Sequence, residues 1–167
     1  MHSFNFDRWN TLLGWVSFTV ALVTYTLTVE PTISFWDTPE YIATSAMLQV
    51  GHPPGAPLFQ LIGAFFSTFT TDVSQIALMV NMVSAVSSAF TILFMFRSLT
   101  MLLRRVTSGT SAPTANNLKV ILGASLVASL AFTFSDTFWY NAVEAEVYAM
   151  SSLFISVLFW LGLRWEQ

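Results

Sequence analysis

Long apolar stretches alternate with short polar segments along this chain of 167 residues. Four of the stretches contain no Asp, Glu, Lys or Arg in their interior, and a helix that crosses a bilayer needs about 20 such residues, within a range of about 17 to 25. The pattern therefore predicts four membrane-spanning helices. Their approximate ranges are residues 10–29, 73–96, 119–135 and 147–163.

A fifth charge-free stretch, residues 41–71, is also long enough to span, but the segment from His52 to Pro57 interrupts it. Three prolines in this segment remove backbone donors and restrict the chain. The flanking pieces, residues 39–50 and 57–69, are each too short for a full crossing. They are predicted to form short interfacial or re-entrant helices in the first loop outside the spans.

The composition favours a membrane protein over a soluble one. Hydrophobic residues make up 54% of the chain and charged residues only 9%, whereas a soluble domain carries about 25% charged residues. The expected fold class is therefore an all-α integral membrane protein with a single transmembrane region. A net charge of −3 provides no basic surface for nucleic acid, and the absence of cysteine excludes disulfides, thiolate metal sites and a Cys nucleophile.

The charged residues sort by side if residues 30–72 stay together on one face of the membrane. All six basic residues then lie on the opposite face, and seven of the nine acidic residues lie on the same face as residues 30–72. The basic residues are Arg8, Arg97, Arg104, Arg105, Lys119 and Arg164. By the positive-inside rule, both termini are expected in the cytoplasm and the acidic loops on the non-cytoplasmic side.

Acidic and aromatic residues gather in the two loops expected on the non-cytoplasmic side. The first loop carries Trp36, Asp37 and Glu40, and the second carries Glu144, Glu146 and Tyr148. The aromatic side chains are typical of the membrane interface, and stacking on a sugar is the alternative. Acids beside a membrane are costly to desolvate and often mark a functional site, where partial burial would raise a carboxyl pKa towards the range of a general base.

Asp37 and Glu40 also have a purely structural interpretation. Asp-x-x-Glu before an apolar run resembles a capping box, with Asp37 at the N-cap, Pro39 in the first turn and Glu40 reaching back from N3. The helix would then run to Val50 and end at Gly51, which suits a left-handed C-cap. Capping and catalysis both remain open for this pair.

Glu144 and Glu146 lie at the mouth of the last span. On a helix they would point to different faces, and Glu144 would share a face with Tyr148 four residues later. The alternative is that Glu144 and Glu146 are both solvated, and that their charges help to fix the orientation of the chain in the membrane. No cofactor follows with certainty, but Asp37 and Glu40 together with Glu144 and Glu146 would offer oxygen ligands of the kind that suit Mg²⁺ or Mn²⁺.

His52 begins the bend that separates the two short helices. Three prolines and Gly55 make this segment a rigid turn at membrane depth. His52 is the one side chain of the non-cytoplasmic loops that can become cationic, so it is a candidate for contact with a phosphate headgroup. A capping or turn residue beside Gly51 is the alternative.

Two motifs carry a family resemblance. The first motif has two parts, FWDTPEYIA at residues 35–43 and LQVGHPPGAPLF at residues 48–59. The second motif is NAVEAEVYA at residues 141–149. Together they resemble a bacterial multi-spanning membrane family of formerly unknown function, which is related to the transmembrane protein O-mannosyltransferases of GT-C type. Members of that family are much longer, so the chain resembles their N-terminal part.

The resemblance implies a glycosyltransferase of the bacterial inner membrane. It would move a sugar from a polyprenyl-phosphate donor to Ser or Thr hydroxyls of acceptor proteins on the non-cytoplasmic face. Asp37, with Glu40 beside it, matches the acidic position of the first outer loop and would act as the base. Glu144 and Glu146 match the second outer loop, where acceptor-positioning or metal-binding groups complete such sites. The N-terminal part alone is expected to be inactive.

Two other classes compete with the transferase. A non-enzymatic scaffold or lipid-binding subunit would have the same topology and would use residues 57–69 and the small residues between Ser84 and Ala89 for helix contacts. A transporter is disfavoured because no charged residue lies in the middle of a predicted span.

Overall fold

The computed structural model describes residues 5–53, 55–108 and 114–166. Within these residues every regular element is a helix. The elements are α1 (Phe6–Thr28), α2 (Thr38–Met47), α3 (Pro57–Ser67), the 3-10 turn η1 (Val73–Gln75), α4 (Ile76–Ser108), α5 (Ala115–Thr133), α6 (Asp136–Ala142) and α7 (Val147–Trp165). Pro54 of the predicted bend and residues 109–113 of the polar connector lie outside the described residues. The all-α fold class is confirmed.

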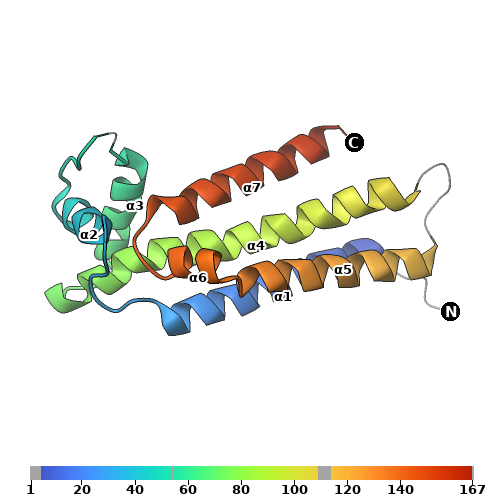
Figure 1. The fold of residues 1–167 in the computed structure, drawn as a ribbon, viewed down its shortest axis with the longest axis horizontal. Helices are drawn as coiled ribbons and strands as arrows, with labels where there is room; N and C mark the ends of the chain where they lie inside the picture. The colour runs from blue at the N-terminus through green and yellow to red at the C-terminus, as the bar shows by residue number, and fades with distance from the viewer. Residues whose placement is uncertain (1–4, 54, 109–113, 167) are drawn as a thin grey trace.

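The four long helices run along the long axis of the molecule, and α2 and α3 gather at one end (Figure 1). Helix α4 packs against α1, α5 and α7 and therefore forms the centre of the bundle. Helices α2 and α3 pack against each other and against α4. All four long helices have the length and apolar composition to cross a membrane, which confirms the prediction of four spans.

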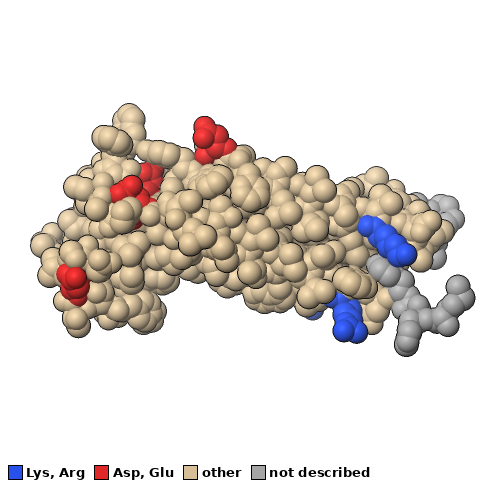
Figure 2. Space-filling model, turned by 90° about the horizontal axis from the view of Figure 1, so that it is seen from below, with Lys and Arg blue, Asp and Glu red and all other residues tan. Residues whose placement is uncertain are grey.

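Acidic and basic side chains gather towards opposite ends of the bundle, apart from Asp7 and Glu166, which lie beside arginines at the basic end. Helix α1 begins and α7 ends at the end opposite α2 and α3 (Figure 1). The face in Figure 2 carries its Asp and Glu side chains towards the α2–α3 end and its Lys and Arg side chains near the other end. On this face the acidic and basic side chains therefore lie towards opposite ends of the long axis of the bundle.

Helix α4 is longer than the predicted span. Its 33 residues extend over about 50 Å at about 1.5 Å per residue, while the hydrocarbon core of a bilayer is about 30 Å thick. The predicted span ended at Phe96 because Arg97 carries a charge. The helix continues because Leu, Met and Arg are good helix formers, so its last turns carry Arg104 and Arg105 beyond the end of the apolar run.

The short helices differ from expectation in detail. Helices α2 and α3 end a few residues earlier than the predicted ranges 39–50 and 57–69. The C-cap of α2 is Leu48, whose backbone is left-handed (φ 51°, ψ 46°), so the predicted C-cap at Gly51 is wrong. Helix α6 was not predicted, because seven residues are too few to show a helical period.

Small residues allow the helices to approach α4 closely. Ala85 and Ala89 of α4 pack with Ala21 and Tyr25 of α1 and with Phe138 of α6 in one buried cluster. A second cluster joins Ile42 of α2, Phe59 of α3 and Met150 of α7 to Val80 and Val83 of α4. The small residues of α4 that the sequence marked for helix contacts are therefore buried. They are Ser84, Ala85, Ser87, Ser88 and Ala89.

Candidate functional site at the acidic end of the bundle

Asn81 of α4 joins the two acidic loops. Its side chain is fully buried, and its Nδ2 donates to the carbonyl oxygens of Glu30 at 2.7 Å and Thr32 at 3.0 Å. Its Oδ1 accepts a hydrogen bond from the backbone N–H of Ala145 at 2.9 Å. One amide thus holds the beginning of the first loop and the turn between α6 and α7 against the same turn of α4.

A backbone contact reinforces this connection. The N–H of Glu30 donates to the carbonyl of Val143 at 2.8 Å. Trp139 of α6 donates from Nε1 to Oγ1 of Thr28, at the end of α1, at 2.9 Å. Asn81 was not predicted as a site residue, although a polar amide within the apolar run of a predicted span is a signal of a buried polar contact.

Glu144 and Glu146 each meet a residue of the first loop. Both side chains are buried, with exposed fractions of 3% and 7%. The hydroxyl of Ser34 donates to Oε2 of Glu144, and Oγ1 of Thr38 lies 3.4 Å from Oε1 of Glu146. The alternative of two solvated acids is therefore wrong, because both carboxylates are enclosed between the loops.

The expected helical relationship between Glu144 and Tyr148 is also wrong. Helix α6 ends at Ala142 and α7 begins at Val147, so Glu144 lies in the turn between them and Glu146 is the N-cap of α7. Tyr148 is 63% exposed and lines a cavity of about 230 Å³ with residues of α5, α6 and α7.

Several acids of the two loops act on one another electrostatically. Burial raises the pKa of the Glu146 carboxyl, and the negative charges of Glu144 and Asp37 raise it further. Burial also raises the pKa of Tyr41, with added contributions from the charges of Glu146, Asp37 and Glu40. The acids of both predicted motifs therefore lie within electrostatic range of each other around Tyr41.

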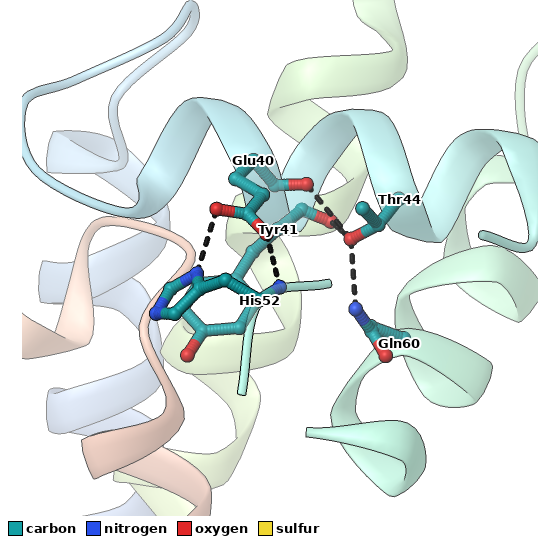
Figure 3. Close-up of polar contacts among 5 residues, drawn as sticks. All are labelled: Glu40, Tyr41, Thr44, His52 and Gln60. Atoms are coloured by element: carbon teal, nitrogen blue, oxygen red, sulfur yellow. Dashed lines mark hydrogen bonds and ion pairs between the residues drawn. The ribbon is translucent and has the colours of Figure 1, made fainter. Parts of the chain in front are cut away.

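Glu40 and His52 form an ion pair across the α2–α3 connection (Figure 3). The backbone N–H of His52 lies 2.6 Å from Oε1 of Glu40, and its Nδ1 lies 2.7 Å from Oε2. The backbone hydrogen bond and then the ring hydrogen bond lower the pKa of Glu40. The hydrogen bond and the charge of Glu40 raise the pKa of His52, so this pair favours an imidazolium beside a carboxylate.

This pair replaces the predicted capping box. Asp37 does occupy the N-cap of α2, but its side chain makes no capping hydrogen bond. Glu40 does not reach back to the N-cap, because both of its oxygens are engaged by His52. Asp37 is exposed and follows Trp36, which is 86% exposed and has a left-handed backbone (φ 60°). Such a φ is uncommon for a bulky residue and indicates local strain directly before Asp37.

A polar network fixes α2 against α3 behind the ion pair. Nε2 of Gln60 donates to Oγ1 of Thr44 at 2.9 Å, and Oγ1 of Thr44 donates to the carbonyl of Glu40 at 2.8 Å (Figure 3). Gly51 fits between these groups, because a Cβ there would lie 2.9 Å from Nε2 of Gln60 and 3.1 Å from Oε1 of Glu40. Gly51 therefore permits a close approach rather than ending a helix.

The acids are not arranged around a common metal position. Within residues 5–53, 55–108 and 114–166, no group of three or more His, Asp or Glu side chains could hold an ion. The described residues therefore do not assemble Asp37, Glu144 and Glu146 into the Mg²⁺ or Mn²⁺ site that the sequence left open. Glu144 and Glu146 are instead engaged by hydroxyl groups of the first loop.

A bundle of apolar helices with enclosed acids and a His–Glu pair at one end defines an integral membrane protein with a polar site at the end of the bundle. The family described as "Protein O-mannosyl-transferase TMEM260 N-terminal domain" matches residues 37–167. The chain belongs to this family. The match begins at Asp37 and includes His52, Glu144 and Glu146.

Two relatives support the assignment. The chain is 24% identical over 146 residues to "Protein O-mannosyl-transferase tmem260" of Dictyostelium discoideum and 27% identical over 146 residues to the mouse protein of that name. These alignments cover 87% and 86% of the chain but only 16% and 18% of the relatives. No solved structure matches the chain. The chain thus corresponds to a small part of the relatives' length.

Proposed function

We propose that this chain forms the N-terminal part of the active site of a glycosyltransferase of GT-C type, of the protein O-mannosyltransferase kind. The complete protein transfers a sugar from a polyprenyl-phosphate donor to Ser or Thr hydroxyls of acceptor proteins. The acidic end of the bundle faces the non-cytoplasmic side and the basic end faces the cytoplasm, as the positive-inside rule requires. The membrane is the bacterial inner membrane.

The observation that carries the proposal is the enclosure of Glu144 and Glu146 between the two loops that contain the family motifs. Each carboxylate contacts a hydroxyl of the first loop, close to Asp37. Burial of a charged group costs free energy. A scaffold has no chemistry that requires buried acids, whereas an active site does. The names of the relatives point to sugar transfer rather than to scaffolding.

Asp37 is the proposed base. Its carboxylate is exposed at the start of α2 and is therefore accessible to a hydroxyl of an acceptor. Asp37 takes the proton of the hydroxyl while the oxygen attacks the anomeric carbon. The bond between that carbon and the donor phosphate oxygen breaks, and its electron pair leaves with the phosphate. Attack in line with the leaving group inverts the anomeric centre.

Glu40 is a poor base, because its two hydrogen bonds from His52 lower its pKa. Its proposed role is to keep His52 protonated, so that the imidazolium neutralises the departing phosphate. The second ring nitrogen of His52 points away from Glu40 (Figure 3) and is the atom proposed to donate to the phosphate. Glu146 and Glu144 position the acceptor, and Trp36 and Tyr148 provide exposed aromatic surfaces for the sugar.

The test compares Asp37→Asn with Asp136→Asn in cells that carry the complete gene. Asp136 is an exposed acid in the second outer loop, so the control removes the same charge near the same end. Mass spectrometry of extracytoplasmic proteins should show loss of a defined Ser- or Thr-linked glycan for Asp37→Asn alone, at equal membrane abundance. Unchanged glycans in Asp37→Asn and in a deletion of the gene would refute the transferase.

A further inference from the structure

We infer that the basic end of the bundle contains a binding site for a phosphate group, and that its ligand is the headgroup of an anionic membrane lipid. The site is a cavity of about 290 Å³ between the first turns of α1, the last turns of α4 and the end of α7. Three arginines line it: Arg97 and Arg104 of α4 and Arg164 of α7. It lies at the opposite end of the bundle from the proposed transferase site.

Helical spacing brings these groups to one place. Arg97 and Arg104 are seven residues apart, or two turns, and therefore share a face of α4. Trp160 and Arg164 are four residues apart on α7, and Asn10 is contributed by α1. Each helix turns a polar or basic face towards the same cavity, although the rest of its length is apolar.

The charge of the cavity is unbalanced. Asp7 is the one acid that lines it, against three arginines. Within the described residues, the ion pairs are Glu40 with His52 and Arg105 with Glu166, so none of the cavity arginines is paired with a carboxylate. Three neighbouring guanidinium groups repel one another unless an anion lies between them, and guanidinium is the group that best matches a phosphate.

The arginines are held in place by aromatic rings rather than by acids. The guanidinium carbon of Arg104 lies 4.6 Å from the ring centroid of Phe6. Those of Arg97 and Arg164 lie 6.0 Å and 5.4 Å from the ring centroid of Trp160. Stacking of this kind orients a guanidinium and leaves its N–H groups available to a further partner.

Two polar atoms of the cavity residues have their hydrogen-bonding capacity unused. Nε of Arg97 and Oδ1 of Asn10 are buried, and neither has a hydrogen-bond partner among the described residues. A buried donor without a partner costs about 1–3 kcal/mol, so such atoms are usually satisfied by a ligand or by water. A phosphate oxygen would satisfy Arg97, and a hydroxyl of the headgroup would satisfy Asn10.

The position of the cavity along α4 favours a membrane lipid as its ligand. Arg97 lies 21 residues after the start of α4 at Ile76, which corresponds to about 32 Å along the helix. This distance is close to the thickness of the hydrocarbon core, about 30 Å, so the cavity lies at headgroup depth when the start of α4 lies at the other surface. Anionic lipids of the cytoplasmic leaflet attract basic groups at this depth.

The test uses the complete protein, purified in detergent and titrated with dioctanoyl phosphatidylglycerol, with dioctanoyl phosphatidylcholine and with inorganic phosphate. The variants are Arg97→Gln, Arg164→Gln and the control Arg8→Gln, which removes one positive charge from the same end outside the cavity. Size-exclusion profiles and circular dichroism establish folding. Arg164→Gln keeps the test valid if Arg97→Gln fails to fold, because Arg164 is exposed.

We expect phosphatidylglycerol to bind with a Kd that rises about tenfold in Arg97→Gln or Arg164→Gln and less than twofold in Arg8→Gln, since one charge-assisted contact corresponds to about a tenfold change. Inorganic phosphate should compete only weakly. Equal affinity for phosphatidylcholine, whose headgroup carries a phosphate but no net charge, would overturn the preference for an anionic lipid. An equal effect of all three substitutions would overturn the phosphate site. Strong binding of inorganic phosphate without any preference for the lipid would overturn the lipid as its source.

Discussion

Both oxygens of the Glu40 carboxylate accept hydrogen bonds from one residue, His52, through its backbone N–H and its ring Nδ1. The two residues are separated by the end of α2 and the bend that follows it. The contact therefore fixes the bend against the first turn of α2. It also couples the charge of His52 to that of Glu40.

The pair should make donor binding depend on pH. The pKa of His52 is raised and that of Glu40 is lowered, so the ion pair is complete between the lowered pKa of Glu40 and the raised pKa of His52. Binding should weaken as pH rises through the pKa of His52. In Glu40→Gln this fall should begin at lower pH, because the hydrogen-bonded charge that raises the pKa is gone. The KM for the lipid donor, measured across pH in the complete enzyme, checks this.

His52→Gln is the companion variant for that experiment. It should raise the KM for the donor about tenfold, through loss of one charge-assisted hydrogen bond, and it should remove the pH dependence. A profile that is unchanged by either substitution would exclude a role of the pair in phosphate binding.

Asn81 should be the most sensitive polar residue for stability. Asn81→Ala leaves the carbonyls of Glu30 and Thr32 and the N–H of Ala145 without their partner. The expected cost is about 2–4 kcal/mol in the free energy of unfolding, since one unsatisfied buried group costs about 1–3 kcal/mol. Thermal unfolding of the complete protein in detergent measures it. Asn141→Ala is the control, because that side chain bonds only within α6, and an equal loss in both variants would contradict the special role of Asn81.

Glu146→Gln should stabilise the protein while impairing transfer. Burial and the neighbouring acids raise the pKa of Glu146, so the folded protein binds this proton more tightly than the unfolded chain does. The stability linked to this group is present below its unfolded pKa and is lost as pH rises through the folded pKa. The Tm of Glu146→Gln should therefore exceed that of the wild type at neutral pH, and the difference should vanish below pH about 4. A lower Tm for the variant at neutral pH would contradict this.

The contact between α2 and α3 should not tolerate a methyl group at Gly63. A Cβ there would lie 2.5 Å from Oγ of Ser45 and 3.3 Å from a methyl carbon of Val80. Gly63→Ala should destabilise the protein by about 1–3 kcal/mol, as overpacking does, and should reduce transfer by displacing α2. Gly123→Ala is the matched control, because no atom lies within 4 Å of its added Cβ. Equal Tm values for the two variants would show that α2 and α3 can move apart to accommodate the methyl group without loss of stability.

The spans could be predicted from the sequence, because the length of an apolar run is sufficient to identify a membrane helix. The bounds of α4 could not, since a charge such as Arg97 ends a hydrophobic window but does not end a helix. Helix α6 was missed because residues 136–142 are too few to show a period and combine polar with aromatic residues. Whether such a short segment forms a helix depends on its tertiary contacts.

The sequence indicates which residues are candidates for a site, but it does not indicate the contacts that they make. Asp37 and Glu40 fit a local capping pattern, and the sequence alone does not reveal that His52, twelve residues further on, engages Glu40 instead. Glu144 and Glu146 were expected on a helix, while the turn between α6 and α7 places both against the first loop. Contacts of this kind depend on the packing of the loops on α4, which no local pattern encodes.

Transfer of mannose in vitro by the purified complete protein tests the proposed site most directly. Wild type, Asp37→Asn and Asp136→Asn are incubated with polyprenyl-phosphate mannose and an acceptor peptide rich in Ser and Thr, and the mannosylated peptide is quantified. Loss of a general base should lower the rate of Asp37→Asn by about 10²–10⁴-fold, with Asp136→Asn close to the wild type. A rate for Asp37→Asn within about twofold of the Asp136→Asn control would show that Asp37 is not the base.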